Sequence, residues 1–457
     1  MRTSKKTVAD YTSGNIPKQL ILFALPFMAS NAMQVLYSLV DMLIVGRFVG
    51  SYGLSAVSIA SQIFTFATML SMGFSTGGQV YIAQLIGAGK KEHISPTIGI
   101  MVSVLTILGI SISALILLFK NAILGLLNAP VESFAMARNY LIVCAAGLIF
   151  TFGYNMVSAV FRGMGDSRHP FLFIMLASVI NLLLDLLFTG LFRWGVTGAA
   201  LATIIGQAVS FFCSVLFLYK NRADFCLDFE PSNFKIRPEI LVPLTKLAVP
   251  FAISSCAINI SMLFVNSMIN SLGVYASAVF GVGCKLDDIV NKISQGIMLA
   301  LSPFVGQNIA AGKTERVKKG VLWSWLYCAV FYVVFTALYI AYSRQMFGLF
   351  TDDINVIEQA PVFVSAIIWG FPAMAFMRGS AGMVQGIGNA KMSMILGILD
   401  GFLFRILLSY LFGIVMDMQL YGFVLGYGLA CYANTIPSTV YFLSGIWKKR
   451  KSLVENI

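Results

Sequence analysis

Asp41 is a carboxylate placed among residues that would otherwise suit lipid. It lies in "YSLVDMLIVGRFVG", and Tyr37, four residues earlier, shares its face of a helix. An ionised carboxylate at the centre of a bilayer costs about 2.5–3.5 kcal/mol. It is tolerated where it faces a cavity, takes up a proton or binds a cation. The alternative is that Asp41 lies near the outer end of its helix and reaches water.

A second oxygen-bearing pair occurs in the apolar run "FLFIMLASVINLLLDLLFTGLF". Its Asn181 and Asp185 are four residues apart and share one helix face. Thr203, in "GAALATIIGQ", adds a hydroxyl from the next apolar run. Oxygen clusters of this kind suit a hard cation or a hydrogen-bonded proton. The pattern therefore predicts an ion site, with hydrogen bonding between packed helices as the alternative.

Composition indicates the elements that must position these residues. Of the 457 residues, 58% are hydrophobic and 11% are charged, whereas soluble domains carry about 25% charged residues. About 20 apolar residues make one membrane-spanning helix, and isolated strands cannot satisfy their backbone in lipid. We therefore predict an all-α integral membrane protein. Its twelve apolar segments are 17–45, 55–87, 96–119, 136–161, 170–192, 196–219, 244–271, 277–310, 320–342, 359–385, 393–415 and 420–446.

The positions of lysine and arginine predict the orientation in the membrane. With the N-terminus in the cytoplasm, 22 of the 31 basic residues fall in cytoplasmic segments and five on the opposite side. This asymmetry predicts that both termini face the cytoplasm of a plasma (cell inner) membrane. The polar start predicts no cleavable signal peptide. The net charge of +12 is then explained by an anionic lipid leaflet and not by nucleic acid.

The chain also repeats itself. "AQLIGAGKKEHI" matches "GQNIAAGKTERV", and "FRGMGDSRHP" matches "VQGIGNAKMS", each 223 residues later, while "LPF" matches "VPF" after 224 residues. Because each half holds an even number of helices, the repeat predicts two parallel six-helix lobes around a central cleft. The predicted parts are a cytoplasmic segment 1–16, an N-lobe 17–219, a linker 220–243, a C-lobe 244–446 and a basic tail 447–457.

The repeat predicts that the ion site belongs to the N-lobe alone. At these offsets Asp41 corresponds to Val265, Asn181 to Phe404 and Asp185 to Leu408. None of the three apolar residues could bind an ion.

The second half carries other charges. Lys285, Asp288 and Lys292 share one face of a predicted helix, where they would line a substrate cleft or pair with one another. Asp287 points elsewhere. Arg378 and Asn155 are further candidates for the cleft. Asp400 and Arg405 are five residues apart, which on an α-helix is too far round to pair well.

Several classes of chemistry have no pattern in the sequence. There is no nucleophile–base pairing, metal-ligand spacing or nucleotide-binding motif, so we predict neither an enzyme nor a cofactor, and an ion gradient as the energy source. The seven cysteines form no C-x-x-C pair and are predicted to be free thiols. His93 and His169 lie in polar loops and are predicted to be solvated.

Together, the twelve segments, the repeat and the paired "AQLIGAGK" and "GQNIAAGK" motifs resemble the multidrug and toxic compound extrusion (MATE) family. The resemblance covers essentially the whole chain, including "FRGMGDSRHP" and "GVTGAALATIIGQ". It implies a cation-coupled exporter of organic, often cationic and amphipathic, compounds. The DinF-like branch is the more similar one, and its N-lobe site residues match Asp41, Asn181, Asp185, Thr203 and Tyr140, while its helix-bending proline matches Pro26. Segments 244–271 and 359–385 lack the acidic residues of the NorM-like branch.

These observations predict an antiporter. A proton or Na⁺ would bind at Asp41, Asn181 and Asp185, bend the first helix at Pro26 and expel a small organic substrate by alternating access. The partners would be that substrate and membrane lipid, and the protein would be a monomer. The main alternative is a flippase for a lipid-linked sugar or cell-wall precursor, held by Lys285, Lys292, Arg378 and Arg405. A channel or structural membrane protein is a third possibility.

Overall fold

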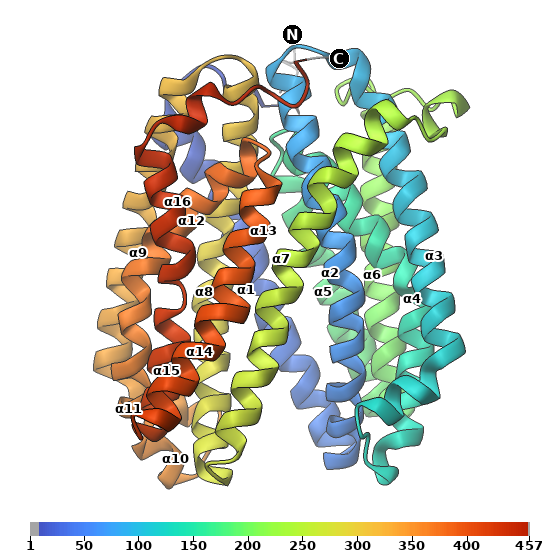
Figure 1. The fold of residues 1–457 in the computed structure, drawn as a ribbon. Coiled ribbons are helices and arrows are strands. Elements are labelled where there is room, and N and C mark those ends of the chain that lie inside the picture. The colour runs from blue at the N-terminus through green and yellow to red at the C-terminus, as the bar shows by residue number, and fades with distance from the viewer. Residues whose placement is uncertain (1–8, 456–457) are drawn as a thin grey trace. The chain divides into compact units, whose positions relative to one another are not determined.

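The chain folds into helices that follow the twelve predicted apolar segments. The computed structural model describes residues 9–455, in which helices and turns occur but no strand. Residues 1–8 and 456–457, which include the start of the predicted segment 1–16, lie outside the described part (Figure 1). The helices of the first half are α1 (Ile16–Phe48), α2 (Ser51–Gly87), α3 (Ile94–Leu126), α4 (Val131–Gly163), α5 (Arg168–Asp185), the π-helical η2 (Leu186–Leu191) and α6 (Gly195–Lys220).

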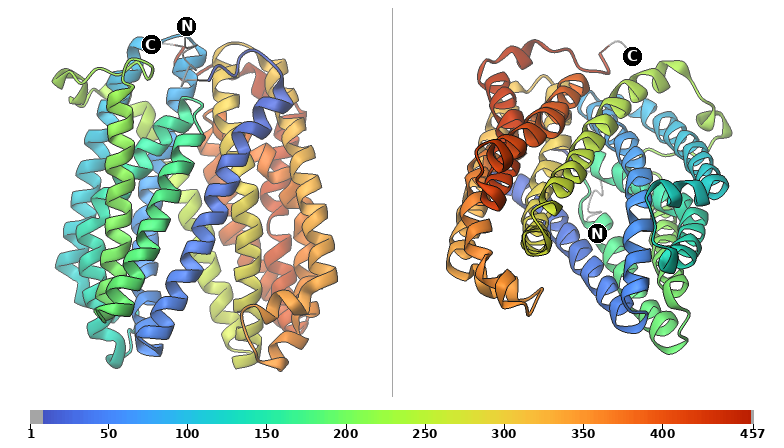
Figure 2. Two further views of the ribbon diagram at one scale, coloured as in Figure 1. Left: turned by 180° about the vertical axis from the view of Figure 1, so that it is seen from behind. Right: turned by 60° about the horizontal axis from the view of Figure 1, so that its bottom comes forward.

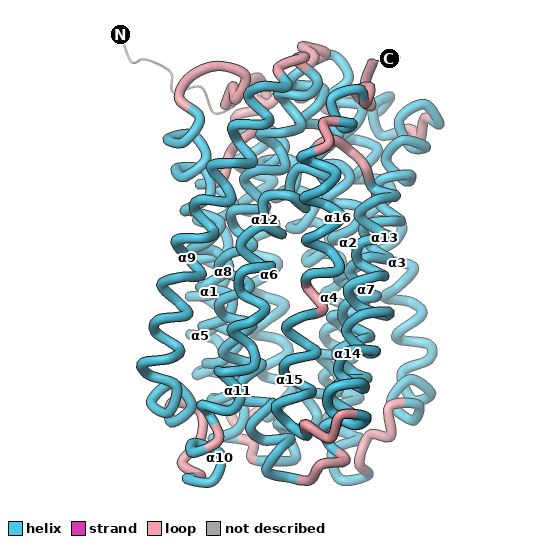
Figure 3. The backbone as a smooth tube through the Cα atoms, turned by 60° about the vertical axis from the view of Figure 1, so that its left-hand side comes forward, coloured by secondary structure: helices cyan, strands magenta, loops and turns pink. Residues whose placement is uncertain are grey.

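The second half repeats this series with more interruptions. Its elements are α7 (Pro238–Asn270), α8 (Val274–Ala310), α9 (Thr314–Gly348), α10 (Ile354–Glu358), α11 (Ala360–Ile367), η4 (Ile368–Gly370), α12 (Phe371–Gly386), α13 (Ala390–Ile398), the π-helical η5 (Leu399–Arg405), α14 (Ile406–Tyr410), the π-helical η6 (Leu411–Val415), α15 (Gln419–Leu429) and α16 (Tyr432–Leu443). Figure 3 shows the short non-helical break between α15 and α16, at residues 430–431.

Ten helical runs in the described residues are long and apolar enough to cross a membrane. Elements α10 to α12 form one of them, 354–386, and α13 to η6 form another, 390–415. The other two predicted spans correspond to α8, which carries four charged residues, and to the interrupted pair α15 and α16. The predicted all-α fold of twelve membrane-spanning segments is thereby confirmed.

The chain divides into two compact units. Within the described residues, unit 1 comprises 9–10 and 29–249, and unit 2 comprises 11–28 and 250–455. In unit 1, α4 lies beside both α3 and α6, as the two views of Figure 2 show. The predicted lobes kept every helix whole, whereas the units divide α1 after Met28 and α7 before Pro250.

Each unit therefore takes in the start of a helix that continues in the other unit. In unit 1, α2 packs against the start of α7, where a Cβ at Gly77 would lie 3.1 Å from Leu247 Cβ. In unit 2, α8 packs against the start of α1, where a Cβ at Gly296 would lie 2.6 Å from the Met28 backbone nitrogen. Glycine is needed at such close approaches because it has no Cβ.

The structure confirms the repeat at the level of individual contacts. A Cβ at Gly163 would lie 2.9 Å from the Gln79 carbonyl oxygen, and one at Gly386 would lie 2.4 Å from the Ser302 carbonyl oxygen. The two members of each matched pair are 223 residues apart. The turns that follow match in the same way. Asp166 Oδ1 accepts the His169 backbone N–H, and Asn389 Oδ1 accepts the Met392 backbone N–H.

Further along each half the offset changes to 224. The backbone N–H of Trp194 donates to the Phe188 oxygen, and that of Met418 donates to the Phe412 oxygen. Gly198 packs on Phe188 just as Gly422 packs on Phe412. The second half has therefore gained one residue between 389 and 411. The π-helical η5 lies in this interval and accommodates the extra residue, because a π turn is closed by i→i+5 bonds.

This extra residue corrects the predicted correspondence between the halves. At the 224-residue offset, which applies from the end of η5 onward, the counterpart of Asn181 is Arg405 and not Phe404. The counterpart of Asp185 is Ser409 and not Leu408, and the counterpart of Thr203 is Tyr427. The polar positions of the first half therefore recur in the second half with different chemistry.

The predicted linker 220–243 is shorter than expected and is packed onto unit 1. Helix α7 begins at Pro238, because proline is favoured in the first turn of a helix. The Ser95 hydroxyl donates to the Asp228 carbonyl oxygen at 2.8 Å, and the Ser103 hydroxyl donates to the Phe234 carbonyl oxygen at 2.8 Å. These bonds from α3 hold the linker in place.

Candidate functional site: an acid pair in unit 1

Four helices of unit 1 bring the predicted ion-site residues together. Tyr37 on α1 lies with its hydroxyl oxygen 3.4 Å from Thr203 Oγ1 on α6. The Asn181 amide on α5 donates to the same Oγ1 at 3.4 Å. Thr203 itself donates to the Ala199 carbonyl oxygen at 3.0 Å, one turn earlier in α6. The threonine hydroxyl thus joins α1, α5 and α6 at one point.

The carboxyl groups of Asp41 and Asp185 face each other within hydrogen-bonding reach. Asp185 is fully buried, and Asp41 is half-buried. No donor among the described residues reaches Asp41 Oδ1, Asp185 Oδ1 or Asp185 Oδ2. Two buried carboxylates in contact repel each other, so they cannot both stay ionised without a proton or cation between them.

The surroundings of this acid pair supply no positive charge. None of the five ion pairs found among residues 9–455 involves Asp41 or Asp185. The Asn181 carbonyl oxygen is also buried without a donor, and its carboxamide lies beside Asp185. The site thus offers oxygens from two acids and one amide, which is the chemistry of an exchangeable proton or a hard monovalent cation.

Helix α4 provides a wall of the site. Tyr140 is buried and faces both Asp41 and Tyr37. Two residues that sequence reasoning missed also lie here, namely Cys144 one turn after Tyr140 and Ser61 on α2. The i, i+4 spacing from Tyr140 was the signal that could have found Cys144.

Two other predicted residues lie apart from the acid pair. Pro26 is inside α1, in the part of that helix that belongs to unit 2. Asn155 is half-buried on α4, and none of the contacts described for the acid pair involves it.

In unit 2, the predicted charged face of α8 is only partly a site. Lys285 and Asp288 are exposed and form no ion pair with each other. The neighbouring Asp287, which sequence reasoning turned away from this face, is buried and accepts two hydrogen bonds. Arg378 is also buried and donates to α8.

The prediction that Asp400 and Arg405 cannot pair is wrong. Arg405 Nη2 lies 2.8 Å from Asp400 Oδ1, and both side chains are buried. The prediction assumed an α-helix, in which residues five apart point in different directions. Residues 399–405 are π-helical, and in a π turn residues five apart are stacked on one face.

Both histidines are partly exposed, and His169 in addition makes specific contacts that the prediction did not include. His169 Nδ1 pairs with Asp166 Oδ2, and its ring stacks on Phe217 at a centroid distance of 3.9 Å. His93 is about one-third exposed beside Glu92. The seven cysteines are free, as predicted.

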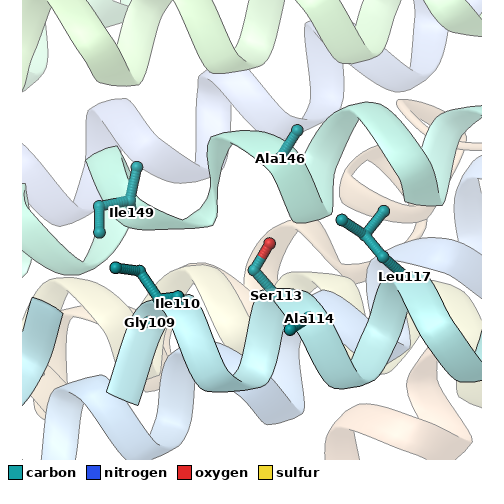
Figure 4. A pocket seen from close by; sticks show the side chains of 7 residues that line it. All are labelled: Gly109, Ile110, Ser113, Ala114, Leu117, Ala146 and Ile149. Atoms are coloured by element: carbon teal, nitrogen blue, oxygen red, sulfur yellow. The ribbon is translucent and has the colours of Figure 1, made fainter. Parts of the chain in front are cut away.

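An apolar hollow lies on the outer surface of unit 1, apart from the acid pair. Figure 4 shows its lining by α3 and α4. The residues are Gly109, Ile110, Ser113, Ala114, Leu117, Ala146 and Ile149, around a volume of about 430 Å³. The Ser113 hydroxyl is already bonded to the Ala145 carbonyl oxygen. Small apolar side chains at the surface of membrane-spanning helices fit lipid chains and supply no ion chemistry.

The comparisons with known proteins agree with this architecture. The MatE family model matches residues 26–187 and again residues 250–411, one match in each half. A probable multidrug resistance protein, YpnP of Bacillus subtilis, is 27% identical over 98% of this chain and 99% of its own. The multidrug export protein MepA of Staphylococcus aureus is 26% identical over 84% of each chain.

Solved structures share the fold. A MOP superfamily transporter from Pyrococcus furiosus, described as having a binding pocket of reverse polarity, superposes with a TM-score of 0.91 at 23% identity over 99% of this chain and all of that one. An outward-facing multidrug resistance MATE family transporter superposes with a TM-score of 0.88 at 23% identity, over 97% of this chain and 99% of that one.

Proposed function

This chain belongs to the MatE family, and on that premise we propose that it is a cation-coupled antiporter that exports organic, cationic amphipathic compounds by alternating access. Its relatives are multidrug resistance and export proteins, so the chain is a multi-pass membrane transporter of small molecules. The acid pair of unit 1 is the observation that carries the coupling.

The acid pair supports ion exchange because it is incomplete without a positive ion. Asp41 and Asp185 are in contact, with three of their four oxygens buried and without a donor. Such a pair is satisfied by one shared proton, which favours proton coupling. The donor-free Asn181 oxygen adds a neutral ligand of the kind that Na⁺ uses. We therefore propose the proton as the favoured coupling ion and Na⁺ as the alternative, and both ions are to be tested.

Uptake of the ion would change the charge of the site from negative toward neutral. Tyr37 and Thr203 join α1 to α6 beside the acid pair, so α1 is the helix that a change of charge would release or bend at Pro26. A substrate that binds one state better than the other is then coupled to the ion, and the coupling free energy is reciprocal.

The flippase alternative has less support. It required Lys285, Lys292, Arg378 and Arg405 as a cationic cradle for pyrophosphate. Arg405 is neutralised by Asp400, and Lys285 is exposed.

As part of the antiporter proposal, the transporter is a monomer in the plasma membrane with both termini in the cytoplasm.

The test uses purified protein in liposomes loaded with a cationic fluorescent dye. Dye transport is measured under a pH gradient without Na⁺, and separately under a Na⁺ gradient at uniform pH. We expect dye to be transported against an inward proton gradient, and the rate to fall when the gradient is collapsed. Transport under the Na⁺ gradient alone would assign Na⁺ as the coupling ion.

The control variants are Asp185→Asn in the site and Asp352→Asn at an exposed position. Asp352→Asn should transport dye as the wild type does. The coupling would be refuted if the rate of dye transport were the same with and without either gradient. It would also be refuted if Asp185→Asn retained gradient-driven dye transport. Movement of a lipid-linked sugar with no dye transport would establish the flippase.

A further inference from the structure

Unit 2 contains a polar cluster in which two residues correspond to the polar neighbours of the acid pair of unit 1. At the 224-residue offset Arg405 is the counterpart of Asn181, and Tyr427 is the counterpart of Thr203. Asn181 contacts Thr203, and correspondingly the Arg405 guanidinium lies over the Tyr427 ring, 4.7 Å from its centroid. The same place in the repeated scaffold thus holds a cationic group in unit 2.

The ion pair orients this cluster. Asp400 fixes the Arg405 guanidinium at 2.8 Å, and the guanidinium packs on Tyr427. The Tyr427 hydroxyl then donates to Asp287 Oδ2 at 3.1 Å. Asp400 and Arg405 neutralise each other and act as positioning residues, because their contacts restrict the tyrosine that holds Asp287.

A single amide bridges the two remaining charges. The Asn291 side-chain Nδ2 donates to Asp287 Oδ2 at 2.8 Å, and the Asn291 side-chain Oδ1 accepts from Arg378 Nη2 at 2.9 Å. Arg378 Nε donates to the Ser294 hydroxyl at 3.2 Å, and that hydroxyl is 2.9 Å from the Tyr332 hydroxyl. Helices α8, α9, α12 and α15 all contribute to this network.

The two charged groups keep one polar atom each for a further partner. Both bonds to Asp287 end on Oδ2, and the bonds of Arg378 use Nε and Nη2. Asp287 Oδ1 and Arg378 Nη1 form no hydrogen bond within the described part of the chain. Neither atom belongs to the set of fully buried side-chain atoms without a hydrogen-bond partner, so each keeps some exposed surface. Asp287 is 2% exposed and Arg378 9% exposed. A buried guanidinium without a directly bonded carboxylate marks a functional site inside a membrane protein.

We propose that Asp287 and Arg378 bind the headgroup of a zwitterionic organic compound, with its ammonium on Asp287 and its carboxylate on Arg378. The Asn291 carboxamide already presents an N–H to the acid and an oxygen to the guanidinium. An α-ammonium and α-carboxylate present the same donor and acceptor, with full charges that strengthen both bonds. The inference rests on the proposed transport of organic compounds, and it adds a zwitterionic class of ligand, bound in unit 2, to the cationic compounds proposed above.

A ligand with only one charge fits this cluster less well. A lone carboxylate would meet Arg378 but would be repelled by Asp287 across Asn291, and a lone ammonium would be repelled by Arg378. A ligand with both charges satisfies each group and leaves the cluster electrically neutral, which is the favoured outcome in a low-dielectric interior.

The test is equilibrium binding in a non-ionic detergent, which needs no gradient. The probes are Nε-dansyl-lysine, a zwitterion with an apolar fluorescent tail, its methyl ester, which is a cation, and its Nα-acetyl derivative, which is an anion. Dansyl fluorescence reports binding. We expect the wild type to bind the zwitterion at least about tenfold more tightly than either derivative, because each derivative leaves one charged group without its hydrogen bond.

Two variants assign the two ends of the ligand. Arg378→Gln should bind the zwitterion and the methyl ester with similar affinity, because the carboxylate has lost its partner. Asp287→Asn should bind the zwitterion and the Nα-acetyl derivative similarly. Arg344→Gln and Asp352→Asn, which change exposed residues of the same types, should keep the wild-type preference. Wild-type selectivity tests the proposal even if a buried variant fails to fold.

The outcomes separate this inference from the proposed function. Equal binding of the three probes by the wild type, or no binding of any, would overturn the zwitterion site while leaving cation-coupled dye export intact. A preference for the zwitterion that survives in Arg378→Gln would also overturn it. Failure of gradient-driven export with the probe preference retained would instead refute the antiport and leave the binding site standing.

Discussion

The fifth helix of the first half and its counterpart in the second half both bury polar and charged side chains, but the charges are satisfied in opposite ways. In α5, Asn181 and Asp185 are buried beside Asp41 with no counter-charge. In the segment from α13 to α14, the buried Arg405 is neutralised by Asp400 from its own helix. The first arrangement is the one for which we propose a mobile positive ion, whereas the second is satisfied by the protein itself.

The pairing within the second of these segments arises from one extra residue. That residue is accommodated in the π-helical η5, which stacks Asp400 and Arg405 on one face and shifts every later position by one. The duplicated scaffold therefore keeps polar residues at corresponding positions, and different residue types at those positions change their charge. Four predictions test this contrast, beginning with the largest expected effect.

Loss of Arg405 should be the most damaging change. In Arg405→Gln the Asp400 carboxylate remains buried without its partner, so the free energy of unfolding should fall by about 3–5 kcal/mol. Denaturation in detergent micelles measures this. The double variant Asp400→Asn/Arg405→Gln should recover most of the loss, since no buried charge is left over. A double variant as unstable as the single one would mean that the pair is not the source of the effect.

Loss of Asp185 should affect coupling more than stability. Asp185→Asn removes the charge that the ion must neutralise, so export driven by the ion gradient should fall about 5- to 150-fold, which corresponds to a coupling free energy of about 1–3 kcal/mol. Dye efflux from liposomes measures the rate. Ser409→Ala, at the corresponding position of the second half, should leave coupling unchanged. An equal loss in both variants would remove the functional distinction between the halves.

The glycines at the repeated helix contacts should differ in their tolerance to alanine. Gly386→Ala would place a methyl 2.4 Å from the Ser302 carbonyl oxygen, whereas Gly163→Ala would place it 2.9 Å from that of Gln79. Overpacking of this kind costs about 1–3 kcal/mol, and Gly386→Ala should lie at the upper end. The midpoints of thermal unfolding give the order, and the reverse order would contradict the contact geometry.

The hydroxyls of Tyr427 and Thr203 should differ in their contribution to stability, and loss of the Thr203 hydroxyl should have the smallest effect of all. Tyr427→Phe removes a hydrogen bond to the charged Asp287 and should cost about 1.5–3 kcal/mol of stability. Thr203→Val removes two long, uncharged contacts of 3.4 Å and the bond within α6 to the Ala199 carbonyl oxygen, and should cost about 0.5–1.5 kcal/mol. Chemical denaturation of both variants compares them. Equal losses would indicate that the charge on Asp287 contributes little.

Much of the fold and part of the acid site could be predicted, because they depend on amino-acid composition and on the helical spacing of residues. Long apolar runs identify membrane-spanning helices, and i, i+4 spacing places Asn181 with Asp185 on one face. The convergence of α1, α5 and α6 on Thr203 required the family resemblance in addition, since no local pattern tells which helices pack together.

The failures have a local cause. The pairing of Asp400 with Arg405 and the correspondence of Asn181 with Arg405 both depend on a π turn, and hydrophobic periodicity does not distinguish one π turn within an apolar helix. Asp287 was missed because its burial is set by Tyr427 on a helix about 140 residues away. The shared helix starts were missed because sequence repeats show which segments are alike and not which neighbours they pack against.

The way in which α1 is divided has a genetic consequence. Met28, near Pro26, is held against Gly296 of unit 2, and Asp41 follows 13 residues later on the same helix in unit 1, a distance of about 20 Å at the helical rise. A substitution that alters the packing of Met28 acts on the same helix that carries Asp41. Second mutations that restore the proposed export to a weakened Asp41 variant should therefore arise around codon 296, in the other half of the gene, as well as beside the acid itself.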